Sequence, residues 1–258
     1  MGKIRFIIFL LFLSSQFVAL AAKPFRFALF TDMHISVLKP QNTEDLKLAI
    51  ADLNTDSSIE FVIISGDDTD LGDSLSLLET KNTLKTLKVP YYITTGNHDT
   101  GRGNIGSTQF LKVFGSDKFS FSAYGFQFIG FPTGPVKGGK FGHITDADID
   151  FVKTTLNTAH NSSFIITHYP LLEGDVDNRV ELINILHKSK VNAVLNGHYH
   201  RNVLLNYDGI PGIVNRSTQR AKEAMGGYSV YSVSDSLKVS EKRIGQPENV
   251  WLTLPLQN

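Results

Sequence analysis

Short apolar runs recur along the chain, and polar residues follow each of them directly. Within a run the apolar positions are nearly continuous, which is typical of strands covered on both faces of a sheet. We therefore predict five buried strands, at residues 25–30, 59–64, 91–93, 164–166 and 191–195.

Segments with apolar residues at helical spacing separate these strands. In the first of them, Asn42 or Thr43 is the expected N-cap of a helix that continues to Leu53. Three further helices are expected, over residues 73–88, 145–156 and 178–188. Strands that alternate with helices form βαβ units, which places the chain in the α/β class.

Three other regions lack helical patterns and predict additional strands. Residues 119–131 are typical of a hairpin that turns at Tyr124-Gly125. Further strands are expected in 202–214 and 228–243, with turns at Pro211-Gly212 and Gly226-Gly227. No linker or internal repeat divides the chain, so we predict one domain at residues 23–245, a two-sheet β-sandwich flanked by helices, and a C-terminal tail at 246–258.

The composition narrows the classes of function. Of 258 residues, 41% are hydrophobic and 19% are charged, which is typical of a globular protein. Lys and Arg number 25, as do Asp and Glu, so a bulk nucleic-acid partner is disfavoured, whereas a small phosphorylated substrate needs only a local positive site. The chain contains no Cys, which excludes disulfides and thiolate ligands to a metal.

Residues 1–22 have the pattern of a signal peptide. Lys3 and Arg5 supply a positive start, residues 6–13 an apolar segment, and residues 19–22 the small side chains of a cleavage site. A transmembrane anchor is the alternative, but this apolar segment is too short to cross about 30 Å of hydrocarbon. We expect an exported protein, periplasmic or extracellular, without a membrane span after cleavage. The lack of Cys favours a bacterial envelope.

The polar residues that follow the predicted strands have a chemistry in common. Ligands bind beyond the carboxyl ends of strands in α/β sheets, so these residues should gather at one edge. Two divalent cations about 3.5–4 Å apart can stabilise the attacking and leaving oxygens of a displacement. Mixed Asp, Asn and His ligands suit Mn, Fe, Zn, Co or Ni better than Ca. The candidates are Asp32, His34, Asp67, Asn97, His98, His168, His198 and His200.

The spacing within two of these blocks adds a geometric expectation. Asp32 and His34 should point to the same side of an extended segment, because the side-chain period of a strand is two. The same argument applies to His198 and His200. Each pair could then face a metal centre from a single stretch of backbone.

The ordered set of blocks resembles the full signature of the calcineurin-like metallophosphoesterase family. The resemblance implies an α/β/β/α fold, two divalent transition-metal ions, and hydrolysis of a phosphomonoester or phosphodiester. The blocks are Asp32-x-His34, Gly66-Asp67-x-x-Asp70, Gly96-Asn97-His98-Asp99, His168 and Gly197-His198-x-His200.

The resemblance also implies a role for each residue. A metal-bridging hydroxide would attack phosphorus, since metal ligation lowers the pKa of water to near 7. His98 would stabilise the developing charge or protonate the leaving oxygen, Asp99 would orient His98, and Asp70 would support the site. One ion would be held by Asp32, His34, Asp67 and His200, and the other by Asp67 as a bridge, Asn97, His168 and His198.

Taken singly, these residues have simpler explanations. Asp32 could be a turn residue, the acidic residues 67–70 could form a solvated turn, and His168 could be a core histidine. His143 and Arg102 could contact substrate, although loop residues of these types are more often exposed to solvent.

Other branches and another class of function were weighed against this hypothesis. Purple acid phosphatases have a tyrosine ligand where Asp70 stands, and the family's protein phosphatases have arginine where Asp99 stands, so both branches are disfavoured. The rival is a non-catalytic scaffold, as in relatives that have lost the catalytic histidine; this chain retains His98.

The signal peptide leads to a direct test. Ala19, Ala21 and Ala22 give an A-x-A site, so the native mature chain should begin at Ala22 or Lys23. N-terminal sequencing of the native protein measures this directly. An intact Met1 on the exported or cell-associated protein would refute the prediction.

Overall fold

A computed structural model describes residues 23–100, 107–135, 141–159, 161–222 and 224–256. The predicted signal peptide and Arg102 lie outside the described residues. In the part of the chain that is described, no helix is both long enough and apolar enough to cross a membrane.

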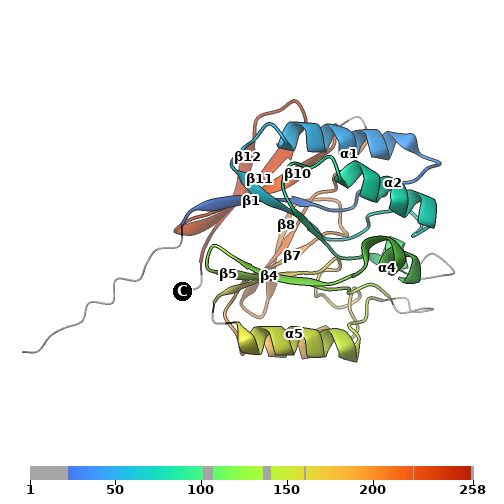
Figure 1. Ribbon diagram of the computed structural model, residues 1–258. Coiled ribbons are helices and arrows are strands. Elements are labelled where there is room, and N and C mark those ends of the chain that lie inside the picture. The colour runs from blue at the N-terminus through green and yellow to red at the C-terminus, as the bar shows by residue number, and fades with distance from the viewer. Residues whose placement is uncertain (1–22, 101–106, 136–140, 160, 223, 257–258) are drawn as a thin grey trace, which may run out of the picture.

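The first of two sheets has six strands in the order β12-β11-β10-β1-β2-β3. Its parallel half is β1 (Phe25–Phe30), β2 (Ile59–Ile64) and β3 (Tyr91–Ile93). Its antiparallel half is β10 (Gly227–Val233), β11 (Ser236–Arg243) and β12 (Asn249–Pro255). Helices α1 (Pro40–Leu53) and α2 (Ser74–Leu84) cover its outer face, and α4 (Thr108–Phe114) packs beside α2 (Figure 1).

The second sheet also has six strands, in the order β4-β5-β6-β7-β9-β8. They are β4 (Phe119–Ala123), β5 (Phe126–Gly130), β6 (Ser163–Ile166), β7 (Val191–Asn196), β8 (Val203–Tyr207) and β9 (Ile210–Val214). Helices α5 (Asp146–Thr158) and α6 (Arg179–Leu186) cover its outer face. The short helix α3 (Asn97–Thr100) follows β3 of the first sheet.

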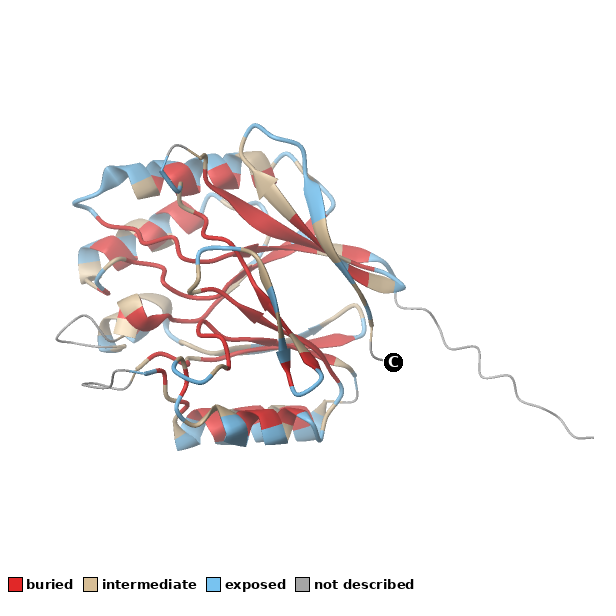
Figure 2. Cartoon of the chain, turned by 180° about the vertical axis from the view of Figure 1, so that it is seen from behind, coloured by how far each residue is buried: buried red, intermediate tan, exposed pale blue. Residues whose placement is uncertain are grey.

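The two sheets pack face to face around an aromatic core. Phe27 of β1 is fully buried, with its ring centroid 5.2 Å from that of Phe61 and 4.7 Å from that of Tyr231. Phe128 and Phe164 approach from the second sheet. Figure 2 shows the strands mostly buried and the helices exposed on their outer surfaces. The predicted α/β/β/α arrangement is confirmed.

Most of the predicted elements are confirmed, but α1 begins earlier than expected. It starts at Pro40, because proline presets the first helical φ and needs no hydrogen-bonded N–H there. Asn42, expected as a cap, instead donates its side-chain amide to the carbonyl of His34 (2.7 Å). Thr145 does cap α5, accepting from the backbone N–H of Asp148.

Two predicted turns are wrong, and the first is at Gly226-Gly227, because Gly227 already belongs to β10. Pro211 and Gly212 lie within β9, and the chain turns at Asp208-Gly209, where φ is 52° and 98°. Two successive residues with positive φ match the right-handed twist of a hairpin, which explains why this pair makes the turn. Pro211 is tolerated because the pairing of β9 with β7 begins only at the next residue.

The segment predicted as a C-terminal tail contributes to the first sheet. Asn249–Pro255 of residues 246–258 pairs antiparallel with β11 as the edge strand β12. Trp251, Leu252 and Leu254 pack against the core between the sheets. This segment therefore forms one edge of the first sheet and covers part of the core between the sheets.

The aromatic core should carry much of the stability. Phe27→Ala is expected to lower the free energy of unfolding by about 3–5 kcal/mol, because it removes a fully buried ring and leaves a cavity. Urea denaturation measures the change. Leu204→Ala, at an exposed position of β8, is the control and should change the free energy by less than about 0.5 kcal/mol. Equal effects of the two substitutions would contradict this assignment of the core.

Candidate metal centre

The candidate residues come from both sheets. Asp32, Asp67 and Asn97 follow β1, β2 and β3 of the first sheet, whereas His168 and His198 follow β6 and β7 of the second. In Figure 1 the carboxyl ends of these strands face the side on which α4 lies. The site therefore lies where the two sheets meet, rather than along a single sheet.

One cluster joins Asp32, His34 and His200. Their ligand atoms all lie within 4.8 Å of one another. The Nε2 atom of His200 is 3.1 Å from Oδ1 of Asp32 and 3.2 Å from Nε2 of His34. Two imidazole nitrogens and a carboxylate oxygen thus face a common point.

A second cluster joins Asp67, His168 and His198, again with ligand atoms within 4.8 Å. The Nε2 atom of His168 lies 3.2 Å from Oδ2 of Asp67. Asp67 also faces the first cluster, because its Oδ2 is 3.8 Å from Nε2 of His34. The carboxylate of Asp67 therefore lies between the two clusters, as a bridging ligand must.

Two buried atoms indicate what the clusters are built to hold. Among the described residues, Nε2 of His168 and Oδ1 of Asn97 have no hydrogen-bond partner, although both are buried. Nδ1 of His168 lies 3.0 Å from the carbonyl of Ser65, so Nε2 is the ring nitrogen that would bind a metal. Unpaired buried polar atoms are costly, and a cation would satisfy both. The residues present therefore fit two transition-metal ions.

Backbone conformation sets the directions of these side chains. Five of the candidate ligands have a left-handed φ, a conformation that is uncommon outside glycine but enriched for Asp and His. They are Asp32 (50°), His34 (47°), Asp67 (51°), His198 (72°) and His200 (54°). The period-two argument does not describe these pairs, because both lie in loops beyond the strand ends, although Asp32 and His34 do face one cluster as expected. His198 and His200, by contrast, belong to different clusters.

Two glycines of the motifs allow backbone and ligands to approach closely. A Cβ at Gly96 would lie 2.2 Å from Oδ1 of Asp67, and one at Gly197 would lie 2.0 Å from Oγ1 of Thr31 and 2.7 Å from Oδ2 of Asp32. Any side chain at these positions would displace the carboxylates. Gly96 and Gly197 therefore leave the space that the carboxylates of Asp67 and Asp32 occupy.

The histidines of the two clusters differ in their protonation equilibria. Burial lowers the pKa of both His34 and His198 to about 4, so these imidazoles are neutral near pH 7, as a ligand must be. Burial opposes protonation of His168 too, but the charges of Asp67 and Asp32 outweigh it and raise its pKa to about 9. A bound cation would compete with this proton, because a ligating imidazole is neutral.

The alternative of a solvated acidic turn is excluded for two of its residues. Asp67 is 1% exposed and Asp68 is fully buried. Burial, reinforced by the charges of Asp99 and Asp67, raises the pKa of Asp68 well above its usual range. Asp68 belongs to neither cluster. The burial of Asp68 could not be recognised in the sequence, where it is simply the residue after Asp67.

His98 forms a third group with His34 and Asp67, one residue from each of the two clusters, and the ligand atoms of this group also lie within 4.8 Å of one another. Its Nε2 is 3.9 Å from Oδ2 of Asp67, and its Nδ1 is 2.9 Å from the backbone carbonyl of Asp70. The side chain of His98 is partly accessible, at 12% exposed. One ring nitrogen is thus held by the protein while the other faces the centre.

Asp99 has a different role from the one that the resemblance implies. Its carboxylate accepts the N–H groups of Asp68 (3.1 Å), Thr69 (2.9 Å) and Gly96 (2.9 Å), and the hydroxyl of Thr69 (2.8 Å). Adjacent residues on a helix do not face each other, so Asp99 points into the fold while His98 points out. Asp99 therefore fastens the loop after β2 to the loop after β3, and the carbonyl of Asp70 orients His98.

Several groups around the site were not recognised in the sequence. The N–H of Thr218 donates to the carbonyl of Thr31, and the hydroxyl of Thr218 accepts from the N–H of Thr31. The hydroxyl of Tyr199, between His198 and His200, donates to Asp175. Tyr199 lies within a motif, whereas no pattern in the sequence marks Thr218 or Asp175.

His143 is paired but does not join either cluster. Its Nδ1 lies 2.8 Å from Oδ1 of Asp177, and both side chains are exposed. Asp70, expected to support the site, does so through its carbonyl, while its carboxylate binds Lys39 (2.7 Å).

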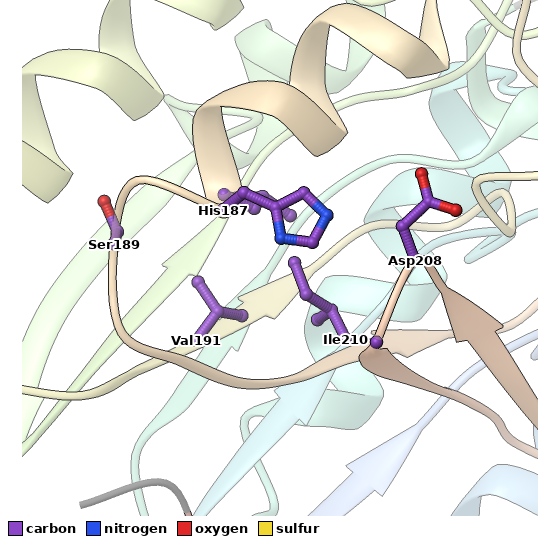
Figure 3. Close-up of a pocket in the computed structure, with 7 residues that line it drawn as sticks. His187, Ser189, Val191, Asp208 and Ile210 are labelled. Carbon is purple, nitrogen blue, oxygen red and sulfur yellow. The ribbon is translucent and has the colours of Figure 1, made fainter.

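Another pocket lies at the opposite end of the second sheet. His187, Asp208 and Ile210 line a hollow of about 190 Å³ beside the amino end of β7 (Figure 3). The metal-binding clusters follow the carboxyl end of that strand. The hollow is therefore separate from the candidate centre, and His187 serves below as a control.

Comparison with known proteins gives the same family. Residues 25–202 match the calcineurin-like phosphoesterase family. Mouse serine/threonine-protein phosphatase CPPED1 is 26% identical over 151 residues, which are 49% of this chain and 46% of that protein. The match thus spans about half the length of this curated relative.

Solved structures of the same fold include two with few identical residues. Purple acid phosphatase PPD1 from yellow lupin has a TM-score of 0.64 and 17% identity, over 90% of this chain and 53% of that one. GAP50, the anchor in the inner membrane complex of Plasmodium, has a TM-score of 0.61 and 14% identity, over 91% and 90%. At such identities the likeness concerns the fold alone.

The sequence match to the family covers most of the chain and includes both clusters, so the chain belongs to the calcineurin-like phosphoesterase family.

Proposed function

We propose that this protein is an exported phosphoesterase that hydrolyses a phosphomonoester or phosphodiester with two divalent transition-metal ions. The observation that carries the proposal is the pair of clusters with unpaired, buried ligand atoms at His168 and Asn97. When bound, the ions supply an activated water and neutralise the charge of the phosphate. Export, to the periplasm or the extracellular space, is supported by the pattern of residues 1–22.

The chain's own residues divide the work. Asp32, His34 and His200 would hold one ion and Asn97, His168 and His198 the other, and Asp67 would be a ligand to both. Asp67 also accepts the backbone N–H of His98 (2.9 Å), which ties the start of α3 to the bridging carboxylate. Displacement of one residue would therefore disturb the other.

His98 acts on the leaving group. Its Nδ1 faces the carbonyl of Asp70, which can only accept, so Nδ1 carries a proton. If Nε2 is protonated as well, the ring can donate a proton to the departing alkoxide; in either state it lies close enough to the centre to interact with substrate. This makes His98 the general acid or charge stabiliser.

Two alternative functions, a non-catalytic scaffold and a protein phosphatase, require different features of the site. A scaffold has no need for buried, unpaired ligand atoms. A serine/threonine-protein phosphatase, the activity in the name of the mouse relative, is disfavoured by Asp99, because this residue is turned into the fold and cannot replace a phosphate-binding arginine. Assays with phosphopeptides and small esters separate these substrates.

The bridging role of Asp67 can be tested by metal content. Asp67→Asn keeps the size of the side chain and an acceptor for the N–H of His98, but removes the charge that separates two cations. At least one ion and most of the activity should be lost. Elemental analysis after Mn²⁺ reconstitution measures this, with Asp150→Asn on the exposed face of α5 as control. Two ions retained by Asp67→Asn would rule out the bridge.

The role of His98 can be separated from ligation. His98→Ala should lower kcat by about 10²–10⁴-fold with an alkyl phosphate while metal content stays unchanged. The loss should shrink with nitrophenyl phosphate, whose leaving group needs little protonation. His187→Ala, an exposed histidine of the distant hollow, should leave both quantities unchanged. Loss of an ion from His98→Ala, with turnover retained in the loaded fraction, would make His98 a ligand instead.

A further inference from the structure

The imidazoles of the site are not all held in the same way. Nδ1 of His168 faces the carbonyl of Ser65, and Nδ1 of His98 faces that of Asp70. Such contacts fix the orientation of a ligating ring. Within the described residues, Nε2 of His200 contacts Asp32 and His34, whereas the ring of His198 packs beside that of Tyr169, with centroids 4.3 Å apart. No backbone carbonyl is found to hold these two rings in the described residues, so their orientation depends more on the backbone that carries them.

That backbone is strained. His198 and His200 both have positive φ, a conformation that costs about 1–3 kcal/mol for each residue and persists only where the surroundings enforce it. The His200 side chain is 40% exposed, so packing does little to hold it. Some contact outside the clusters must stabilise this turn.

Tyr199 provides that contact. It lies between the two histidines, and its hydroxyl donates to Oδ2 of Asp175 in the segment between β6 and α6. The guanidinium of Arg201 lies 5.8 Å from the centroid of its ring. On the other side of the turn, the N–H of His198 donates to the carboxylate of Asp32 (3.0 Å), itself a candidate ligand.

Asp175 is in turn fixed by the backbone around it. Its N–H donates to the carbonyl of Leu172 (3.2 Å), and its carbonyl accepts the N–H of Gly142 (2.7 Å). The acceptor for Tyr199 is thus held by its own loop and by the segment before α5. It does not depend on the metal centre for its position.

We propose that Tyr199 and Asp175 are positioning residues, whose hydrogen bond holds His198 and His200 in their ligating orientations. Since the two histidines belong to different clusters, a single contact outside the centre adjusts both metal sites. The inference rests on the proposed metal ligation. It predicts that loss of the hydrogen bond weakens metal binding without unfolding the protein.

The test is calorimetric titration of the metal-free protein with Mn²⁺. Tyr199→Phe keeps the ring and removes only the hydroxyl, so binding at one or both sites should weaken by roughly 10–100-fold. Asp175→Ala should cause a similar loss. The double variant should bind as either single variant does, because both substitutions break the same hydrogen bond.

Tyr228→Phe is the matched control. The hydroxyl of Tyr228 also bonds a carboxylate, that of Asp52 on α1 (2.8 Å), away from the clusters. This variant should keep the metal affinity of the native protein, whatever its effect on the midpoint of thermal unfolding. The midpoint of metal-free Tyr199→Phe, measured in parallel, reports whether that variant is folded.

The outcomes distinguish this inference from the proposed function. If the native protein binds Mn²⁺ and folded Tyr199→Phe binds it equally well, the positioning role is wrong and the proposed function stands. Additive losses in the double variant would also contradict a shared hydrogen bond. If the native protein binds no metal, the proposed function fails and the inference with it.

Discussion

The attraction between buried carboxylates of the first sheet and imidazoles of the second is the interaction on which the site depends. Asp67 faces His168 at 3.2 Å, and Asp32 faces His200 at 3.1 Å. Removing such charges from water is costly unless partners are close and well oriented. Cations held between the same groups would provide such partners for both carboxylates.

Because each cluster draws ligands from both sheets, the packing of the sheets determines the shape of the centre. The aromatic core around Phe27 and Phe128 fixes the spacing of the two layers. Close packing transmits small changes, so a core substitution that shifts one sheet would also change the distance between Asp67 and His168. Stability and ligation are thus linked through the same core.

The loops that present the ligands need support of their own. Their left-handed residues are held by contacts outside the clusters: Asp99 joins the loops after β2 and β3, and Tyr199 joins the turn after β7 to Asp175. Both Asp99 and Tyr199 are polar side chains that point away from the metal centre. The rigidity of the ligand-bearing loops therefore depends on these hydrogen bonds.

Much of this could be predicted from the order of residues alone. Apolar runs define the central strands because burial on both faces excludes polar residues, and the motif residues follow those strands because ligands gather at strand ends. Local sequence therefore determined the α/β class, the two-sheet arrangement and the list of candidate ligands. It also defined the hairpin at Tyr124-Gly125, since that turn depends on neighbouring residues.

Only the tertiary structure decided how these parts act together. The division of His198 and His200 between clusters, the inward orientation of Asp99 and the bond from Tyr199 to Asp175 all depend on turn geometry and on contacts between distant segments. Hydrophobic periodicity carries no information on either. The physical reason is that a left-handed φ at a single residue redirects a side chain, and the energy that permits it comes from partners far away in the sequence.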